Sequence, residues 1–201
     1  MKRTETSHRG RPRSFDERAA LEAALSVFWK HGYEGASLAE LTAAMGINRP
    51  SLYAAFGNKE ELFRRALDHY TAGAAALHEN ALRQPTARAA VEKLLRSAAD
   101  ALGDCKNPRG CLLVQSALVC GTAGESVKQE LIARRAAVRA AWRKRFQKAK
   151  ADGDLPADAD PAALARYLSA LSAGMAVEAV NGADRAELRR LADVALRAWP
   201  V

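Results

Sequence analysis

The chain has 201 residues, enough for one large or two small domains with a hydrophobic core. It is 49% hydrophobic but only 6% aromatic, which favours close-packed helices over a sheet, because strands are enriched in β-branched and aromatic residues. No apolar run is long enough to cross a bilayer, and residues 1–13 are too polar for a signal peptide. We therefore expect a cytoplasmic protein with no membrane partner.

The formal net charge of +8 suits a partner that carries phosphates. One segment, residues 128–150, holds nine basic residues against the single acid Glu130 and so accounts for the whole excess. The net charge therefore does not locate a DNA-binding region. A solvated helix face is the favoured interpretation of this segment, with an anion pocket or a DNA contact from some of its arginines as alternatives.

The first part of the chain is a basic arm followed by a helix. Residues 1–13 form the arm, in which Arg11 and Arg13 are candidates for phosphate or minor-groove contacts, with a solvated tail as the alternative. Ser14 and Glu17 have the spacing of a capping box, which predicts a helix to about His31 that ends at Gly32.

Residues 37–56 contain two short helical patterns joined at Gly46. Ser37 followed by Glu40 is a second capping box, and apolar residues then recur at helical spacing up to Met45. Gly46 adopts positive φ without steric penalty and can end the first helix. Such a pair of helices around a glycine turn is typical of a DNA-reading helix-turn-helix.

The second of these helices has its own start signals. Asn48 is a good N-cap, and Pro50 falls in the first turn, where its missing N–H costs little. The apolar positions are predicted to pack against the first helix. The residues left outside are Arg49, Ser51, Tyr53 and Ala54 or Ala55.

Five further helices and one ambiguous apolar run follow. Asn58 with Glu61 and Asp184 with Glu187 are capping signals. The helices are predicted from 58 to about 82, from about 87 to 103, from 125 to 152 with Val138 on its inward face, from 161 to about 180, and from 184 to about 199. The run 111–120 fits a strand or a buried helix, and the helical context favours a helix.

Several ordered motifs resemble the tetracycline-repressor (TetR) family of bacterial regulators. They are Gly32-Tyr33-Glu34-Gly35-Ala36-Ser37-Leu38, Ala44-Met45-Gly46-Ile47, Pro50-Ser51-Leu52-Tyr53 and Phe56-Gly57-Asn58-Lys59-Glu60-Glu61-Leu62-Phe63. The resemblance covers about residues 11–70. It implies an all-α homodimer with a three-helix DNA-binding head, a long linking helix and a larger ligand-binding and dimerisation body. We accordingly expect the arm at 1–13, the head at 14–57 and the body at 58–201.

The resemblance assigns double-stranded operator DNA as the partner of the head. Arg49 and Ser51 are the candidates for reading bases, because arginine can pair bidentately with guanine; a phosphate contact is the alternative for Arg49. Alanine at 54 and 55 can touch a thymine methyl but donates no hydrogen bond. The full set of predicted DNA contacts is Arg11, Arg13, Tyr33, Ser37, Asn48, Arg49, Pro50, Ser51, Tyr53 and Lys59.

The last two helices carry leucines interleaved with small residues, which allow close helix approach. This pattern fits an intramolecular core or a four-helix interface between two copies. The family resemblance favours the homodimer.

The three cysteines are Cys105, Cys111 and Cys120, and their spacing is not that of a zinc site. Burial as small hydrophobic residues is the default for Cys111 and Cys120. Cys105 falls in a predicted loop beside Lys106, where positive charge favours the thiolate, so thiol-based redox or electrophile sensing is an alternative. No metal or cofactor is predicted.

A small-molecule effector of unknown identity is expected in the body. Candidate pocket residues are Trp142, Tyr167, Met175 and Glu178, although an interface role fits Tyr167 and Glu178 equally. The sequence thus predicts a ligand-responsive repressor. A small helical enzyme and a protein-interaction adaptor are the alternatives from other classes, and no nucleophile–base pair or phosphate-binding glycine loop favours an enzyme.

Overall fold

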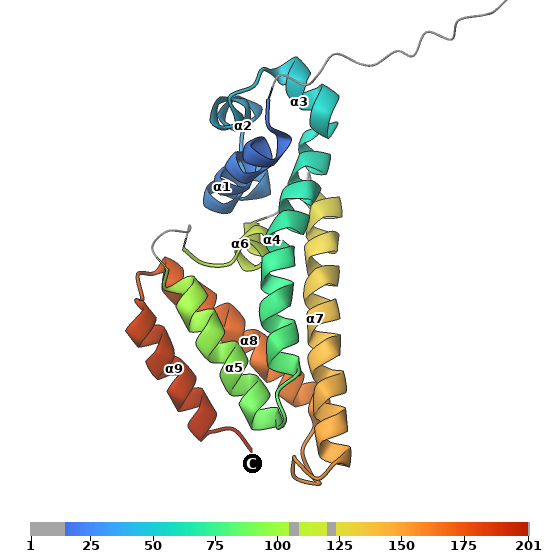
Figure 1. Ribbon diagram of the computed structural model, residues 1–201, viewed down its shortest axis with the longest axis vertical. Coiled ribbons are helices and arrows are strands. Elements are labelled where there is room, and N and C mark those ends of the chain that lie inside the picture. Colours follow the sequence, from blue (N-terminus) through green and yellow to red (C-terminus); the bar gives the residue numbers. More distant parts are fainter. Residues whose placement is uncertain (1–14, 105–108, 120–123, 201) are drawn as a thin grey trace, which may run out of the picture.

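The computed structural model describes residues 15–104, 109–119 and 124–200, except for the side chains of 117–119. In these ranges the chain forms nine helices and no strand, which confirms the all-α prediction (Figure 1). The helices are α1 (Glu17–Gly35), α2 (Leu38–Met45), α3 (Arg49–Phe56), α4 (Lys59–Leu82), α5 (Ala87–Leu102), α6 (Leu112–Val119), α7 (Glu125–Ala151), α8 (Pro161–Val180) and α9 (Arg185–Arg197).

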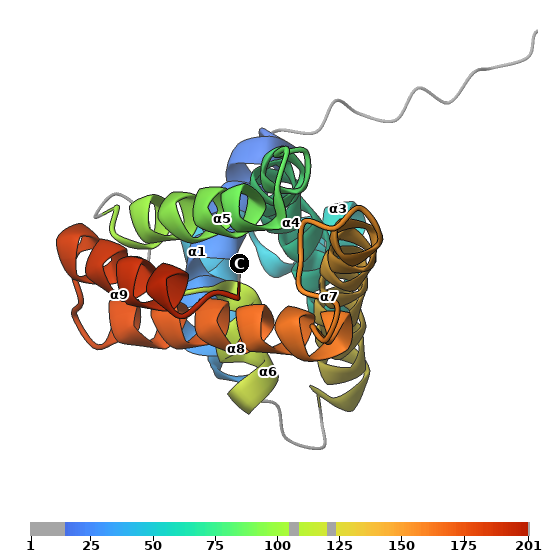
Figure 2. The ribbon, with the colours of Figure 1, turned by 90° about the horizontal axis from the view of Figure 1, so that it is seen from below.

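The molecule has a small head and a larger body. Helices α1, α2 and α3 gather at one end, and α4 leads from them along the length of the body beside α7 (Figure 1). Seen from below, α5 and α8 lie between α9 on one side and α7 on the other (Figure 2). The head therefore connects directly to α4, while α9 lies at the side of the body opposite α7.

Local capping signals set most helix starts. The predicted capping boxes at Ser37, Asn58 and Asp184 are all present, each with the glutamate three residues later reaching back to the cap. Ser14 of the predicted box with Glu17 lies outside the described residues. Helix α1 begins at Glu17 and Asp16 caps it, because the Asp16 carboxylate accepts from the N–H groups of Arg18 and Ala19.

Helix α1 breaks where the sequence predicts its end. Gly32 has φ 69° and ψ 179°, a conformation outside the helical region that residues with a Cβ rarely adopt. A short helical turn follows, so that α1 formally reaches Gly35. The break redirects the chain into α2.

The described buried apolar side chains form two clusters. One lies in the body, on α5, α8, α9 and the C-terminal half of α7. The other fills the head, and it also includes the first half of α4, Leu112 of α6, and Val127 and Leu131 of α7. The head core therefore crosses the boundary predicted at residue 58 and joins the head to two helices of the body.

The prediction for α7 needs one correction. Val127, Leu131, Trp142 and Phe146 are buried as expected, but Val138 is 37% exposed. Val138 lines a cavity instead of packing in a core. Over the described ranges, no helix is both long and apolar enough to span a membrane.

Candidate functional site

Helix α2 is held by a reciprocal cap. The Ser37 Oγ accepts from the N–H of Glu40 (3.1 Å) and donates to Glu40 Oε2 (2.7 Å), while the Ser37 N–H donates to the same carboxylate (3.0 Å). These hydrogen bonds to Ser37 lower the pKa of Glu40. A DNA phosphate that approached the start of α2 would compete with the Glu40 carboxylate for the Ser37 hydroxyl and the Ser37 N–H.

The turn between α2 and α3 has the predicted construction. Gly46 caps α2 in the left-handed region (φ 65°, ψ 28°), and its N–H bonds back to the last turn of the helix. Asn48 Oδ1 accepts from the N–H of Ser51 at 2.9 Å, and Pro50 lies in the first turn of α3. The start of α3 is thereby fixed relative to α2.

The outer face of α3 is polar at its N-terminus. Arg49, Tyr53 and Ala54 are exposed, Tyr53 by 49%, and Ser51 is half-buried. Ala55 is not on this face: it is only 8% exposed and packs in the head core with Leu52 and Phe56. The surface available to a base edge is therefore smaller than the sequence suggested, with Ala54 as its single exposed alanine on α3.

Arg65 of α4 contacts the C-terminal end of α3, a contact that the sequence did not reveal. Its Nη1 donates to the carbonyl of Ala55 (3.2 Å), and its guanidinium lies 5.4 Å from the centre of the Phe56 ring. A cation at the carbonyl end of a helix satisfies an unpaired acceptor and interacts favourably with the helix dipole. Only the tertiary approach of α4 to α3 brings these groups together.

Tyr33 and Lys59, both predicted phosphate contacts, meet at the base of the head. Lys59 Nζ donates to the carbonyl of Glu34 (3.3 Å) and lies 4.8 Å from the centre of the Tyr33 ring. Partial burial lowers the pKa of Lys59. The Tyr33 ring also packs edge-on against Phe63 (5.2 Å between centroids), so both residues brace the junction of α1 and α4. Arg11 and Arg13, also predicted contacts, lie outside the described residues.

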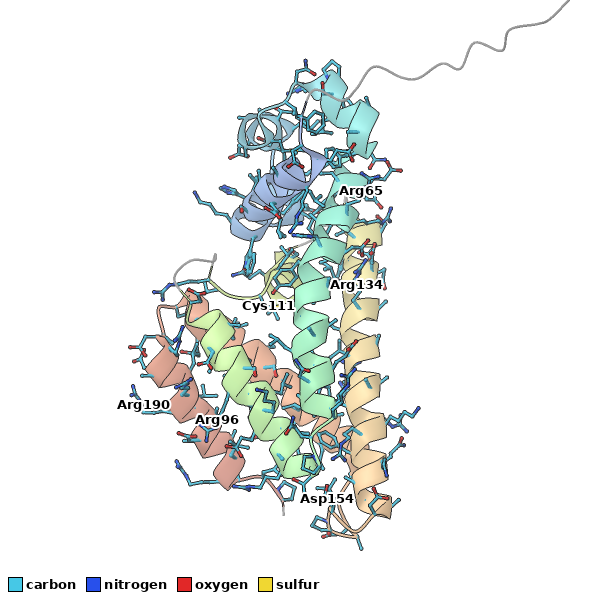
Figure 3. The ribbon with its side chains drawn as sticks, in the orientation of Figure 1. Arg65, Arg96, Cys111, Arg134, Asp154 and Arg190 are labelled. Atoms are coloured by element: carbon cyan, nitrogen blue, oxygen red, sulfur yellow. The ribbon has the colours of Figure 1, made fainter. Side chains whose placement is uncertain are left out.

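An ion-pair network joins α4 to α7 directly below the head; we call it the α4–α7 network. Arg64 pairs with Glu60 (2.6 Å) and Glu130 (2.8 Å), and Arg134 pairs with Glu130 (2.6 Å) and Asp68. Burial acts to raise the pKa of Glu130, but the hydrogen bonds from Arg134 and Arg64 outweigh it and hold the pKa below its usual value. Figure 3 shows Arg134 where the two helices run side by side.

The body contains a cavity of about 130 Å³ between α4, α5, α6, α7 and α8. The apolar part of its described lining includes Leu94, Leu113, Val114, Trp142 and Leu168. Its polar part is His78, Cys111, Arg135, Arg139, Ser169 and Ser172. The indole N–H of Trp142 donates to His78 Nδ1 at 3.0 Å, and burial lowers the pKa of His78, so the imidazole is held neutral with its remaining proton on Nε2.

The four predicted pocket residues do not line one common pocket. Trp142 lines the cavity. Met175 is fully buried in the body core, and Tyr167 and Glu178 are exposed on α8. Sequence reasoning did not assign Leu94, Ser169 or Ser172 to the pocket. It raised an anion pocket on the basic run of α7 as an alternative, without indicating which arginines would line it.

Of the three cysteines, Cys111 alone lies within the described residues. Cys111 lies just before α6 and lines the cavity, with its Sγ 3.4 Å from the Tyr70 hydroxyl (Figure 3). Burial, followed by the neighbouring Cys111, raises the pKa of Tyr70. Cys105 and Cys120 lie outside the described residues. Across the described part of the chain, no group of three His, Cys, Asp or Glu side chains is placed to hold a metal ion.

The helix-turn-helix with its exposed α3, carried on a larger helical body, is the architecture of a DNA-binding transcriptional regulator. Comparison with known proteins assigns both parts. Residues 20–66 match the family described as bacterial regulatory proteins, tetR family, and residues 85–195 match the tetracyclin repressor-like C-terminal domain. The chain belongs to the TetR family of transcriptional regulators.

Individual relatives cover nearly the whole chain. The HTH-type transcriptional repressor ComR of Escherichia coli is 34% identical over 194 residues, 96% of this chain and 92% of ComR. The HTH-type regulator YezE of Bacillus subtilis is 31% identical over 93% of this chain and 97% of its own. A cysteine mutant of the TetR-family regulator CifR, solved with 26-bp double-strand operator DNA, is 44% identical with a TM-score of 0.90, covering 94% of this chain and 100% of that one.

Proposed function

We propose that this protein is a homodimeric, ligand-responsive transcriptional repressor that reads an operator through α3. The observation that carries the proposal is the exposed N-terminal face of α3, with Arg49 and Tyr53 pointing away from a helix-turn-helix held by two caps and a glycine turn. A relative of this chain is a repressor, and a second was solved on operator DNA. Both support the same role for this head.

Within α3, we assign base reading to Arg49 and Ser51 and backbone contacts to Tyr53. The N-terminal residues of a recognition helix approach base edges, whereas phosphate contacts fix the position of the protein. Arg49 has no ion pair or hydrogen bond with any described residue, so its guanidinium is available for guanine O6 and N7. Asn48 and Pro50 act by holding the start of α3.

The dimer is assigned to the exposed face of α8 with α9. The exposed residues Ala163, Tyr167, Ala170, Gly174 and Val177 follow one another at spacings of four and three, which is the stripe of a helix that pairs with another helix. Val194 of α9 is 57% exposed. A two-fold interface on this face would cover both and set the distance between the two heads.

The effector is assigned to the body cavity. Its described lining includes residues of both α4 and α7, the two helices that the α4–α7 network joins below the head. A ligand that binds better when these helices are displaced would favour a head spacing that does not fit the operator. The ligand must distinguish the two arrangements, because equal affinity for both shifts nothing.

A salt titration of duplex binding tests the proposed function. The full chain should bind its operator with an affinity that falls steeply with salt and exceeds its affinity for unrelated duplex by about 10³-fold or more. Equal affinity for operator and unrelated duplex would contradict a regulator. An adaptor or an enzyme with a helix-turn-helix-like head would show no such selectivity.

The thiol-sensor alternative has no support from the comparisons, and its central residue, Cys105, lies outside the described residues. We therefore retain the ligand-responsive repressor as the single proposed function.

A further inference from the structure

The polar lining of the body cavity is cationic. Arg135 and Arg139, one turn apart on α7, both line it, and no carboxylate is found among its described lining residues. The remaining polar groups are hydroxyls, a thiol and a neutral imidazole. Charged side chains that are partly buried are usually paired, so positive charge beside an apolar wall favours an anionic partner.

The two arginines differ from others on the same helix. Arg134 pairs with Asp68 and Glu130, and Arg145 lies 3.9 Å from Asp154 and donates to the carbonyls of Gln84 and Pro85. Arg135 and Arg139 are also partly buried, yet neither forms an ion pair or a hydrogen bond with a described residue. A partly desolvated guanidinium loses hydration without compensation unless an anion pairs with it.

The lining also includes a neutral hydrogen-bond donor. Ser169 of α8 lines the cavity, and its hydroxyl has no hydrogen-bond partner among the described residues, whereas the neighbouring Ser172 hydroxyl donates to the carbonyl of Leu168 at 2.9 Å. Two arginines of α7 and a serine of α8 thus line the same cavity as the apolar Leu94 and Trp142.

The positive charge continues to the surface. Arg139 also lines an outer groove between α7 and α8, together with Arg143 and Arg166. The carboxylate in the described lining of that groove, Asp160, accepts from the N–H of Ala162 at 2.8 Å as the cap of α8. The groove shares Arg139 and Ala165 with the cavity lining, and the positive charge of its arginines attracts anions and raises their local concentration.

We propose that the cavity binds a small apolar compound with one anionic group, which pairs with Arg135 and Arg139 while its apolar part rests against Leu94, Trp142 and Leu168. The size is set by the volume of about 130 Å³, close to the ~150 Å³ of an apolar cavity that holds benzene. The ligand class is thus a single ring or short alkyl chain with a carboxylate or phosphate. This inference rests on the proposed function only in taking the cavity as the effector site.

Direct binding to the full chain, without DNA, tests the proposal. Benzoate, phenyl phosphate, benzyl alcohol and benzylamine have the same ring and differ in charge. In calorimetric titrations, at least one of the two anions should bind about tenfold or more tightly than the alcohol, as a charge-assisted bidentate pair predicts, and the amine should bind least. Absence of saturable binding by both anions, or an alcohol or amine that binds as tightly, would overturn the proposal.

Two arginine variants and one control distinguish a specific ion pair with the ligand from general electrostatic attraction. R135Q and R139Q should each reduce the preference for the anion over the alcohol by several-fold, with little change in affinity for the alcohol. K144Q removes one positive charge from an exposed position on the same helix and should keep the preference. A preference unchanged in both arginine variants, or reduced equally in K144Q, would contradict the assignment.

Failure of this inference can be distinguished from failure of the proposed function. If benzoate binds through the arginines but never releases the operator, the ligand class stands and ligand-responsive repression fails. If the operator is bound and released by a neutral compound while the anions do not bind, repression stands and the ligand class fails.

Discussion

The head and the body use their residues differently. In the described part of the head, every Leu, Ile, Val, Met, Phe and Trp side chain is buried or half-buried, the helix ends are capped by neighbouring residues, and α3 exposes Arg49 and Tyr53. In the body, long helices line a cavity with two arginines that have no partner among the described residues, and α8 exposes an apolar stripe. The head thus leaves few large apolar groups at its surface, whereas the body leaves charged and apolar groups for which the proposed function supplies partners.

Under the proposed function, the head and the body have different tasks. A rigid reading surface keeps base contacts in register, and the caps of α2 and α3 together with Arg65 provide that rigidity. A part that responds to a ligand needs two arrangements of similar free energy, and open space with unpaired charge lowers the cost of rearrangement. The α4–α7 network connects the two parts.

The largest expected effect is the loss of stability when a buried phenylalanine of either core is truncated. Phe63 and Phe146 are both fully buried, in the head and body clusters respectively. Phe63→Ala and Phe146→Ala should each lower the free energy of unfolding by about 3–5 kcal/mol, because each leaves a cavity. Chemical denaturation measures the loss. At a temperature where both variants are folded, operator affinity should fall for Phe63→Ala and persist for Phe146→Ala; equal retention would break the assignment of DNA binding to the head.

The next effect concerns base reading. Arg49→Ala should weaken operator binding by about 1–3 kcal/mol and relax the preference at one base pair in each half-site, because a bidentate pair with guanine is lost. Gel-shift titrations on operators mutated one position at a time measure both quantities. Arg83→Ala, on the body end of α4, is the control and should change neither. If the Arg49 variant keeps the wild-type base preference, Arg49 contacts a phosphate and does not read a base.

A smaller effect distinguishes positioning from reading. Tyr53→Phe removes the phenolic hydroxyl and should weaken binding by about 0.5–1.5 kcal/mol, the net value of one hydrogen bond. The loss should be the same on every operator variant, because a phosphate contact carries no sequence information. A loss confined to one base position would move Tyr53 to the reading face.

The smallest effect concerns the link between head and body. Because the folded-state pKa of Glu130 is lowered, its contribution to stability is present above the unfolded pKa of about 4.3 and is lost as pH falls through the folded pKa. The difference in unfolding free energy between wild type and Glu130→Gln, below about 1 kcal/mol at neutral pH, should therefore shrink in acid.

Glu79→Gln is the control for the link, because Glu79 and its partner Arg83 are 65% and 75% exposed. Its difference from wild type should be smaller, because an exposed ion pair contributes little to stability. A Glu130 variant whose difference from wild type does not shrink in acid would show that the network does not hold α4 to α7.

The sequence predicted the head well because its signals are local. Capping boxes, the Gly46 turn and the Asn48 cap depend on residues three or four positions apart, and all three are found in the structure. Where a prediction failed, a contact from elsewhere decided the outcome. Ala55 is buried by the head core, and Val138 lines a cavity formed by several helices of the body. Among the arginines of α7, sequence alone could not distinguish Arg134, which has carboxylate partners, from Arg135, which has none among the described residues.

The central claim is that α3 of a two-fold dimer reads a specific operator, and selection of genomic DNA fragments by the full chain, followed by footprinting, tests it most directly. The account predicts enrichment of fragments that contain two related half-sites with centres about 34–36 Å apart along the duplex, or a multiple of that distance. Enrichment that disappears in Arg49→Ala would assign the reading to α3. Fragments recovered without a shared sequence, or a footprint covering a single half-site, would contradict the claim.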